Sequence, residues 1–420
     1  MVVRRRDTRG RYNGARVRVL KWISLVLAGL VLLLFAAVLV LVWLVDPNGF
    51  KPRIEAAVRD ATGRELTLVG DIDLGFFPWL SLRTGEGRFG NAPGFGSEPM
   101  VSWKGARLGA KLLPLLRGEL VASRVRLEGA DVRLLRRKDG RANWDGIGSG
   151  EPKDPNARAM PLRIDGVELE DARISFVDET VPRRIVVESL DLTTDEIAER
   201  EPFTDTEISG VLHMDGFAPA GVPFRVEVPR AEIAWDLSSI VVKEYEVEFG
   251  VLAVEGGVQG TVGTEGGAST RLAGGIETNE FDLRALLGAT GIEAPATTDP
   301  RALGKLRLKT NWELENGAIA IDPLALDLDD TRFTGDFRRG GGEDPVGEFA
   351  LRGNSLDIGR YIPPPDPTSE PFVLPTATLA ALRFRGQIEL EQATLDDIVM
   401  KGVTLRLVLD ERGLRNEPKP

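Results

Sequence analysis

From Leu66 onward, apolar and charged residues alternate with a period of two over most of the chain. In residues 305–315, leucine, threonine and tryptophan alternate with lysine, arginine, asparagine and glutamate, and similar alternation recurs around 121–128, 244–251 and 382–391. Because successive side chains of a strand point to opposite faces, each segment predicts a half-buried β-strand. A one-residue slip would move charges onto the apolar face, so the pairing register is well defined.

The predicted helices are too few to cover the apolar face of the predicted strands, which number roughly twenty on the period-two pattern. Besides a helix over 50–62, the sequence favours only short helices near 112–117, 282–288, 356–361 and 393–397. Periodicity alone leaves two solutions open. The sheet folds onto itself as a sandwich or barrel, or it curls into an open trough whose apolar lining is covered by a ligand.

An uncharged segment of 24 residues, Trp22 to Val45, precedes the strands. At about 1.5 Å per residue, a helix of this length spans a hydrocarbon core of about 30 Å. Trp22 and Trp43 lie near its ends, where indoles favour the membrane interface. A cleaved signal peptide would have a shorter apolar core, of about 7–15 residues. The segment therefore predicts a transmembrane helix that stays as an anchor.

The charges on the two sides of this segment differ in sign. Residues 1–21 carry eight basic residues and one acid, a net of +7, so the remainder of a chain of net charge −11 carries −18. The positive-inside rule then predicts a cytoplasmic N-terminus and an exported body that follows Asp46. So acidic a body predicts no nucleic-acid partner, because phosphate contacts require a basic surface.

A short helix is predicted directly after the anchor. Asn48 is the expected N-cap, Pro52 lies in the first turn, and Gly63 is the expected stop. The apolar stripe of this helix contains Phe50, Ile54, Val58 and Ala61. We expect the stripe to cap the following sheet; the alternative is a helix that lies on the membrane surface.

The residue inventory argues against an enzyme. The chain has no cysteine, which excludes disulfides, thiolate zinc sites and cysteine nucleophiles. Its one histidine, His213, leaves almost nothing for a histidine-based metal site or a catalytic triad. A G-x-G-x-x-G at residues 85–90 is followed by Asn-Ala-Pro-Gly, which breaks helices, so these glycines are predicted to be turns and not a cofactor loop. Asp327, Asp329 and Asp330 lack the glycine and the closing glutamate of a calcium loop and predict a solvated turn. We expect no catalytic residue, cofactor or metal.

A set of motifs within residues 46–145 closely resembles the N-terminal region of the AsmA family of Gram-negative envelope proteins. They are F-K-P at 50–52, A-T-G-R at 61–64, F-P-W-L at 77–80, G-N-A-P-G-F at 90–95, K-L-L-P-L-L-R-G-E at 111–119 and D-G-R-A-N-W at 139–144. From about 160 to 412 the resemblance is weaker. There, the segments at 281–292 and 356–366 look like recurring inter-strand segments of that family.

The resemblance implies an inner-membrane anchored periplasmic protein tied to outer-membrane assembly. It also implies the architecture of bridge-like lipid carriers, a mainly β protein with a long, curved, mostly antiparallel sheet and an apolar groove, which favours the trough over the sandwich. The expected organisation is listed by residue: a basic cytoplasmic arm (1–21), the transmembrane helix (22–45), an AsmA-like β module with its capping helix (46–146), a linker (147–161) and a repeated β-strand groove (162–420).

The predicted function is the carriage of phospholipid along this groove between the inner and outer membranes. The expected groove residues are Phe76, Trp79, Leu80, Leu82, Val125, Leu127, Val247, Phe249, Leu306, Leu308, Trp312, Phe384, Ile388 and Leu390. Phospholipid, the inner membrane and an outer-membrane or envelope protein at the C-terminal end are the expected partners. The alternative is an assembly factor that holds outer-membrane proteins by strand addition; an envelope hydrolase is disfavoured.

The last predicted unit begins at Gly413 and stops within a few residues. Since members of the family usually continue further, the sequence leaves open a truncated member, a frameshifted reading or one subunit of a longer conduit.

Overall fold

The computed structural model describes residues 47–75, 79–111, 120–122, 124–145, 162–181, 183–195, 197–198, 203–234, 238–263, 269–342, 345–363, 383–410 and 413–416. The predicted cytoplasmic arm and transmembrane helix, residues 1–45, lie outside these ranges. Within the described ranges, no helix has the length and apolar character that a membrane crossing needs.

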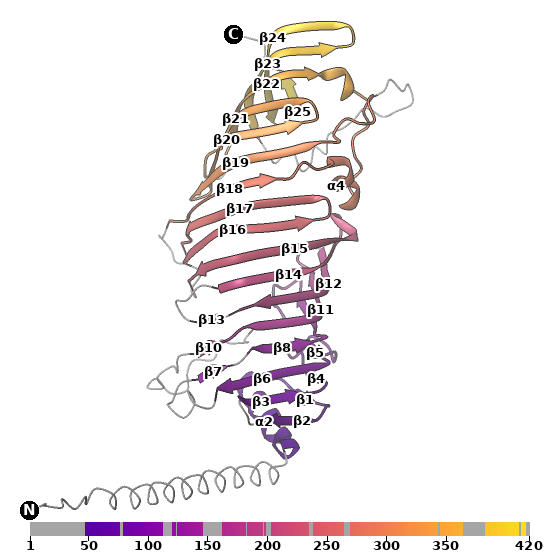
Figure 1. Cartoon of the computed structure of the whole chain (residues 1–420). Coiled ribbons are helices and arrows are strands. Elements are labelled where there is room, and N and C mark those ends of the chain that lie inside the picture. Colours follow the sequence, from indigo (N-terminus) through magenta and orange to yellow (C-terminus); the bar gives the residue numbers. More distant parts are fainter. Residues whose placement is uncertain are drawn as a thin grey trace, which may run out of the picture.

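Within the described residues, 25 strands form a single sheet. In Figure 1 they stack in a curved ladder along the long axis of the molecule, from α2 at one end to β24 at the other. The first nine are β1 (Leu66–Leu68), β2 (Ile72–Gly75), β3 (Trp79–Thr84), β4 (Gly87–Phe89), β5 (Val101–Trp103), β6 (Gly105–Lys111), β7 (Leu120–Ala122), β8 (Val125–Glu128) and β9 (Asp131–Arg136). The mainly β class and the long curved sheet are thus as predicted, and one sheet takes the place of a two-sheet sandwich.

The remaining strands are longer and form the body of the ladder. They are β10 (Leu162–Ile164), β11 (Val167–Asp178), β12 (Arg183–Thr194), β13 (Ile197–Ala198), β14 (Phe203–Met214), β15 (Ala218–Ile233), β16 (Ser239–Phe249), β17 (Leu252–Thr261), β18 (Arg271–Thr278), β19 (Leu306–Glu315), β20 (Ala318–Leu328), β21 (Thr331–Arg339), β22 (Gly347–Asp357), β23 (Phe384–Leu395), β24 (Ile398–Asp410) and β25 (Gly413–Asn416).

The N-terminal strands pair in two half-width ladders that lie end to end across the sheet. One ladder is β2–β3–β6–β8 and the other is β1–β4–β5–β9. β8 and β9 then pair in parallel with successive halves of β11. Gly70 lies between β1 and β2, and Gly85 lies between β3 and β4, where the chain passes from one ladder to the other. The two glycines approach so closely that a Cβ on Gly70 would lie 2.5 Å from the Gly85 Cα. Only glycines permit this contact.

From β11 to β22 the long strands pair antiparallel, β22 pairs in parallel with β23, and β24 and β25 complete the sheet. Register shifts recur in these ladders, with Asp171 at φ 48° and Ser189 at φ 47°. Further shifts lie between β15 and β16, β16 and β17, and β20 and β21. Bulges bend the bulged strand and increase its twist, which gives the curvature a local cause.

Four helices are described: η1 (Pro47–Phe50), α2 (Lys51–Thr62), α4 (Leu283–Ala289) and η2 (Ile358–Arg360). α2 matches the helix predicted over 50–62, and Gly63 ends it in the left-handed conformation at φ 69°. The expected N-cap was wrong, because Phe50 occupies that position and no side chain caps the helix. Asn48 instead accepts a hydrogen bond from the Ile72 N–H at 3.0 Å and ties the helix to β2. Glu55 likewise accepts from the Leu68 N–H at 2.9 Å, so α2 is fixed to the end of the sheet.

Two other helix predictions needed correction, whereas α4 matches the prediction near 282–288. The segment at 393–397 belongs to β23 and the turn that follows it, because Ala393 is fully buried against the neighbouring strands. Of the segment 356–361, only Ile358–Arg360 is helical, since Leu356 and Asp357 complete β22. The segment 112–117 lies outside the described residues.

Candidate functional site

One face of the sheet is apolar along its length, and the strand register makes it continuous. One row of paired positions runs through Leu127, Leu169, Leu192, Ile208, Val226, Val247 and Val254. A second row runs through Leu308, Leu326, Phe333, Gly353, Leu390 and Val403. Val254 pairs with Thr278, whose hydroxyl accepts from the Leu308 N–H at 2.9 Å, so the two rows join. We call this surface the apolar face.

Most side chains of the apolar face are half-buried. Leu306, Leu308 and Trp312 all keep part of their surface accessible. Two clusters are buried from solvent. One contains Ala172 and Leu190, and the other contains Phe333, Leu390 and Ala393. Between these clusters the apolar side chains of this face are half-buried.

The predicted groove residues fall into three groups. Leu82, Val125, Leu127, Val247, Phe249, Leu306, Leu308, Trp312, Phe384 and Ile388 occupy positions on the apolar face and are half-buried. Leu390 lies on the same face but is only 2% exposed, so it packs in the sheet and offers no surface to a ligand. Phe76 lies outside the described residues. Trp79 and Leu80 are successive residues of β3, paired with Lys111 and Ala110, so the alternation assigns them to opposite faces.

The opposite face carries a network of cross-strand ion pairs. Arg126 contacts Glu168 at 2.8 Å, and Glu277 binds both Arg307 and Lys309 at 2.6 Å. The hydrogen bond from Lys309, followed by that from Arg307, lowers the pKa of Glu277. Each exposed pair contributes little to stability by itself, because water and salt screen it. Together they keep this surface, the charged face, in water and leave the other face for apolar contact.

A hollow of about 850 Å³ opens over β16 to β20. Its lining mixes charged residues such as Lys243, Glu313 and Arg338 with apolar ones such as Val258 and Trp312. Glu313 and Arg338 share a charged-face row through Ala320, so the hollow opens on the charged face.

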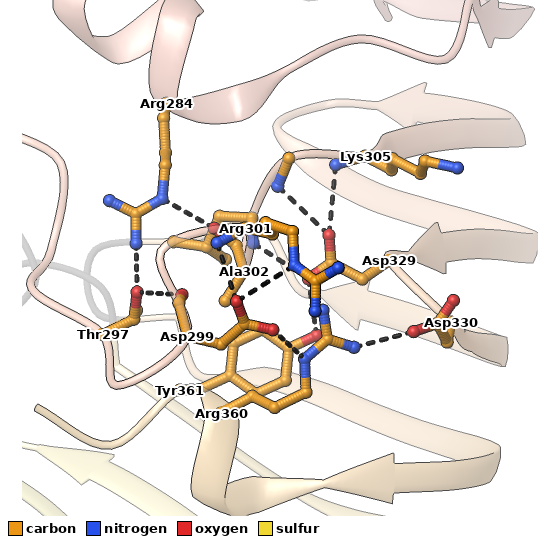
Figure 2. Close-up of polar contacts among 12 residues, drawn as sticks. Arg284, Thr297, Asp299, Arg301, Ala302, Lys305, Asp329, Asp330, Arg360 and Tyr361 are labelled. Atoms are coloured by element: carbon orange, nitrogen blue, oxygen red, sulfur yellow. Dashed lines mark hydrogen bonds and ion pairs between the residues drawn. The ribbon is translucent and has the colours of Figure 1, made fainter.

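A polar cluster holds the edge of the sheet near α4 (Figure 2). The Asp329 carboxylate accepts hydrogen bonds from the backbone N–H groups of Leu303, Gly304 and Lys305 at 2.9, 3.1 and 3.1 Å. It also accepts from the Tyr361 hydroxyl at 2.7 Å. Burial, reinforced by this hydrogen bond, raises the pKa of Tyr361. We call these contacts the Asp329 clasp.

Arg360 extends the clasp by pairing with Asp299 at 3.0 Å and Asp330 at 2.7 Å. The clasp therefore ties the segment between β18 and β19 to the β20–β21 turn and to η2. Asp329 and Asp330 form the β20–β21 turn, as the sequence predicted, whereas Asp327 lies in β20. Asp329 is half-buried there, and both of its oxygens accept hydrogen bonds in the clasp. Among the described residues, no group of histidines and acids is arranged to hold a metal ion.

Two donors on the apolar face have no hydrogen-bond partner among the described residues. They are the Nε1 of Trp312 and the Nε of Arg339, both shielded from solvent. The Trp312 ring lies over Gly274, where an added Cβ would come within 3.0 Å of the indole. Arg339 was not among the expected residues of this face, although Phe333, Phe337 and Arg339 are separated by even numbers of residues in β21 and so share one face.

The sequence comparisons identify related proteins. Residues 17–218 match the model of the AsmA family. The chain is 24% identical over 198 residues to AsmA family protein YhjG of Escherichia coli, a match that covers 44% of this chain and 28% of the relative. It is 34% identical over 105 residues to Protein AsmA of Escherichia coli, covering 25% of this chain and 17% of that protein. The matched segments thus span less than a third of either relative.

Proposed function

Since residues 17–218 belong to the AsmA family, we propose that this chain works in the Gram-negative cell envelope as a membrane-tethered carrier of phospholipid. In this proposal residues 22–45 anchor it in the inner membrane with the N-terminus in the cytoplasm, and the β-sheet lies in the periplasm. Family membership supports a role in the envelope and in outer-membrane assembly. The chemistry of the sheet supports the choice of cargo.

The observation that carries the proposal is the continuous, half-buried apolar face. Lipid acyl chains need apolar area and few directional contacts, and each methylene that leaves water contributes about 0.8 kcal/mol. The leucines, valines and isoleucines of the two rows offer such a surface over many strands without an intervening barrier of charge. A row of this kind allows a chain to move from one strand to the next at nearly constant energy.

The curvature and the charged face support the same function. The bulges bend the sheet, and a sheet curved around its apolar face would shelter acyl chains as a groove. The ion pairs of the opposite face keep the outer surface soluble. Head groups, which are hydrated, would remain at the open rim.

Lipid binding by the full chain tests the proposal. The protein is purified from membranes in detergent, and co-purified phospholipid is measured by native mass spectrometry. We expect bound phospholipid in the wild type and its loss in Leu308→Asp, because a carboxylate on the apolar face repels acyl chains. Asn311→Asp, on the same strand but on the charged face, is the matched control and should retain lipid.

A lipid-free wild type, or equal lipid in Leu308→Asp and wild type with both folded by circular dichroism, would refute the carrier function. If the lipid-free protein also suppressed aggregation of unfolded outer-membrane proteins, the assembly-factor alternative would be favoured.

A further inference from the structure

We infer that Arg83 and Arg107, on the charged face of the β2–β3–β6–β8 ladder, form a site for the phosphate group of an anionic membrane phospholipid. The inference goes beyond the proposed function, because it concerns the face that does not carry acyl chains. Only the source of the phosphate rests on the proposed function, which places this end of the sheet at the inner membrane. The evidence is a run of like charges that the sheet itself does not neutralise.

Three arginines stand side by side on adjacent strands. The register pairs Arg83 of β3 with Arg107 of β6, and Arg107 with Arg126 of β8. Residues directly opposite each other have Cβ atoms about 4.5–5.5 Å apart, and like charges at such positions destabilise a sheet. By contrast, Arg173 of β11 meets Glu188 of β12 at 2.7 Å. The arginine row is therefore a cost to the fold unless an anion offsets it.

Two of the three guanidinium groups have no acid that neutralises them. Arg126 is held by Glu168 through two hydrogen bonds, at 2.8 and 3.0 Å. The side chains of Arg83 and Arg107 make no ion pair or hydrogen bond within the described part of the chain. Asp73 lies opposite Arg83 in the register, yet these two form no ion pair. Both arginines are exposed, so an anion from outside the protein can reach them.

A hollow of about 150 Å³ opens at these arginines. A single water needs only about 10–15 Å³, so the hollow has room for a phosphate group. Gly105 and Glu128 also line it, and they pair with each other one row away from the arginines. A Cβ on Gly105 would lie 3.5 Å from the Glu128 Oε2, so this carboxylate borders the hollow beside the glycine.

The chemistry of two adjacent guanidinium groups selects the ligand. Guanidinium binds phosphate oxygens through two parallel hydrogen bonds, and it has no acceptor of its own. A head group that carries no cation leaves the whole phosphate charge to the two arginines, which favours anionic phospholipids over zwitterionic ones.

The place of the row points to the membrane as the source of the phosphate. η1 begins at Pro47, two residues after the predicted transmembrane segment ends at Val45. In Figure 1, α2 lies at the same end of the ladder as β2 and β3. β3 and β6 are the second and third strands of their ladder, so the two arginines lie about 5–10 Å along it from β2. The anchor thus holds this row close to the phospholipid head groups.

Inorganic phosphate tests the site in the full-length protein, purified in a neutral detergent. Hydrogen exchange of β3 and β6 is measured as phosphate is titrated, with sodium chloride holding the ionic strength constant. Exchange should slow in the wild type, by about tenfold when phosphate exceeds its Kd tenfold. Arg83→Gln and Arg107→Gln should each weaken binding at least about tenfold, the low end expected for loss of a hydrogen bond to a charged group.

Three further measurements separate binding from structure. Without phosphate, Arg107→Gln should exchange no faster than the wild type, because it removes a like-charge contact. Glu128→Gln should lower the Kd for phosphate about twofold, because it removes one screened negative charge beside the ligand. Arg88→Gln is the matched control, since Arg88 is exposed on β4 of the other ladder and pairs with Glu86 at 2.6 Å; it should bind phosphate as the wild type does.

Nanodiscs test the membrane as the source. The full-length protein is placed in discs of phosphatidylcholine alone and in discs that also contain phosphatidylglycerol. Phosphatidylglycerol should slow exchange in β3 and β6 of the wild type, and this slowing should be lost when Arg83→Gln and Arg107→Gln are combined.

Each outcome separates the alternatives. Wild-type exchange that ignores phosphate, or that slows equally in Arg107→Gln, overturns the site and leaves the carrier function standing, because that function depends on Leu308 and the apolar face. Slowing by inorganic phosphate without slowing by phosphatidylglycerol overturns the head-group assignment and identifies a site for a soluble phosphate compound. Slowing by phosphatidylglycerol that survives the double substitution also overturns the inference. A wild type without co-purified lipid refutes the carrier function and does not change the result at this site.

Discussion

The buried side chain of Asn143 gives the sharpest test of how the N-terminal module is held together. Asn143 is 1% exposed and belongs to the D-G-R-A-N-W segment. Its Oδ1 accepts from the Leu135 N–H at 3.0 Å, and its Nδ2 donates to the Arg133 carbonyl at 2.7 Å and to the Asn91 Oδ1 at 3.0 Å. One side chain thus fixes the loop that follows β9 and the 91–95 turn.

Asn143→Ala removes all three hydrogen bonds and leaves the Leu135 N–H and the Arg133 carbonyl without this partner. An unsatisfied buried group costs about 1–3 kcal/mol, so the two backbone groups predict a loss of about 2–6 kcal/mol in the free energy of unfolding. The measurement is urea unfolding of the full chain in detergent, followed by far-ultraviolet circular dichroism. Asn311→Ala, at an exposed position of β19, is the control and should change the free energy by less than about 0.5 kcal/mol. A loss below 1 kcal/mol for Asn143→Ala would show that the module does not depend on this residue.

Two further predictions concern the sheet edge and the charged face. Asp329→Ala removes the acceptor of three backbone N–H groups in the Asp329 clasp, so hydrogen exchange at residues 303–305 should accelerate at least tenfold. Exchange in β14 should stay at its wild-type rate. Equal protection of residues 303–305 in variant and wild type would contradict the role of the clasp. In the folded state the pKa of Glu277 is lowered, first by the hydrogen bond from Lys309 and then by that from Arg307. The stability that the ionised Glu277 contributes is therefore complete above its unfolded-state pKa of about 4.3, and it is lost as the pH falls through its folded-state pKa. Glu277→Gln should therefore lower Tm at pH 7 and show a smaller drop in Tm between pH 5 and pH 3 than the wild type; parallel curves would argue against the ion pairs.

The two faces of the sheet could be predicted from the sequence because alternation is a local property. In residues 305–315 the direction of each Cβ follows from its place in the strand, so Leu308 and Lys309 must lie on opposite faces. The helix that ends at Gly63 was predictable for the same reason, since a left-handed terminal residue favours glycine. Where local signals were weak, as at 393–397, the buried contacts of Ala393 within the sheet decided the structure.

The tertiary structure alone decided which strands meet. Alternation is the same in a sandwich and in an open sheet, so only long-range pairing could select the single sheet and the parallel contact of β22 with β23. The same pairing brings Trp312 and Arg339 onto neighbouring rows and brings Asp329 within reach of Tyr361. Local chemistry fixes where each side chain points, whereas the distance between side chains on different strands is set by how the whole chain folds.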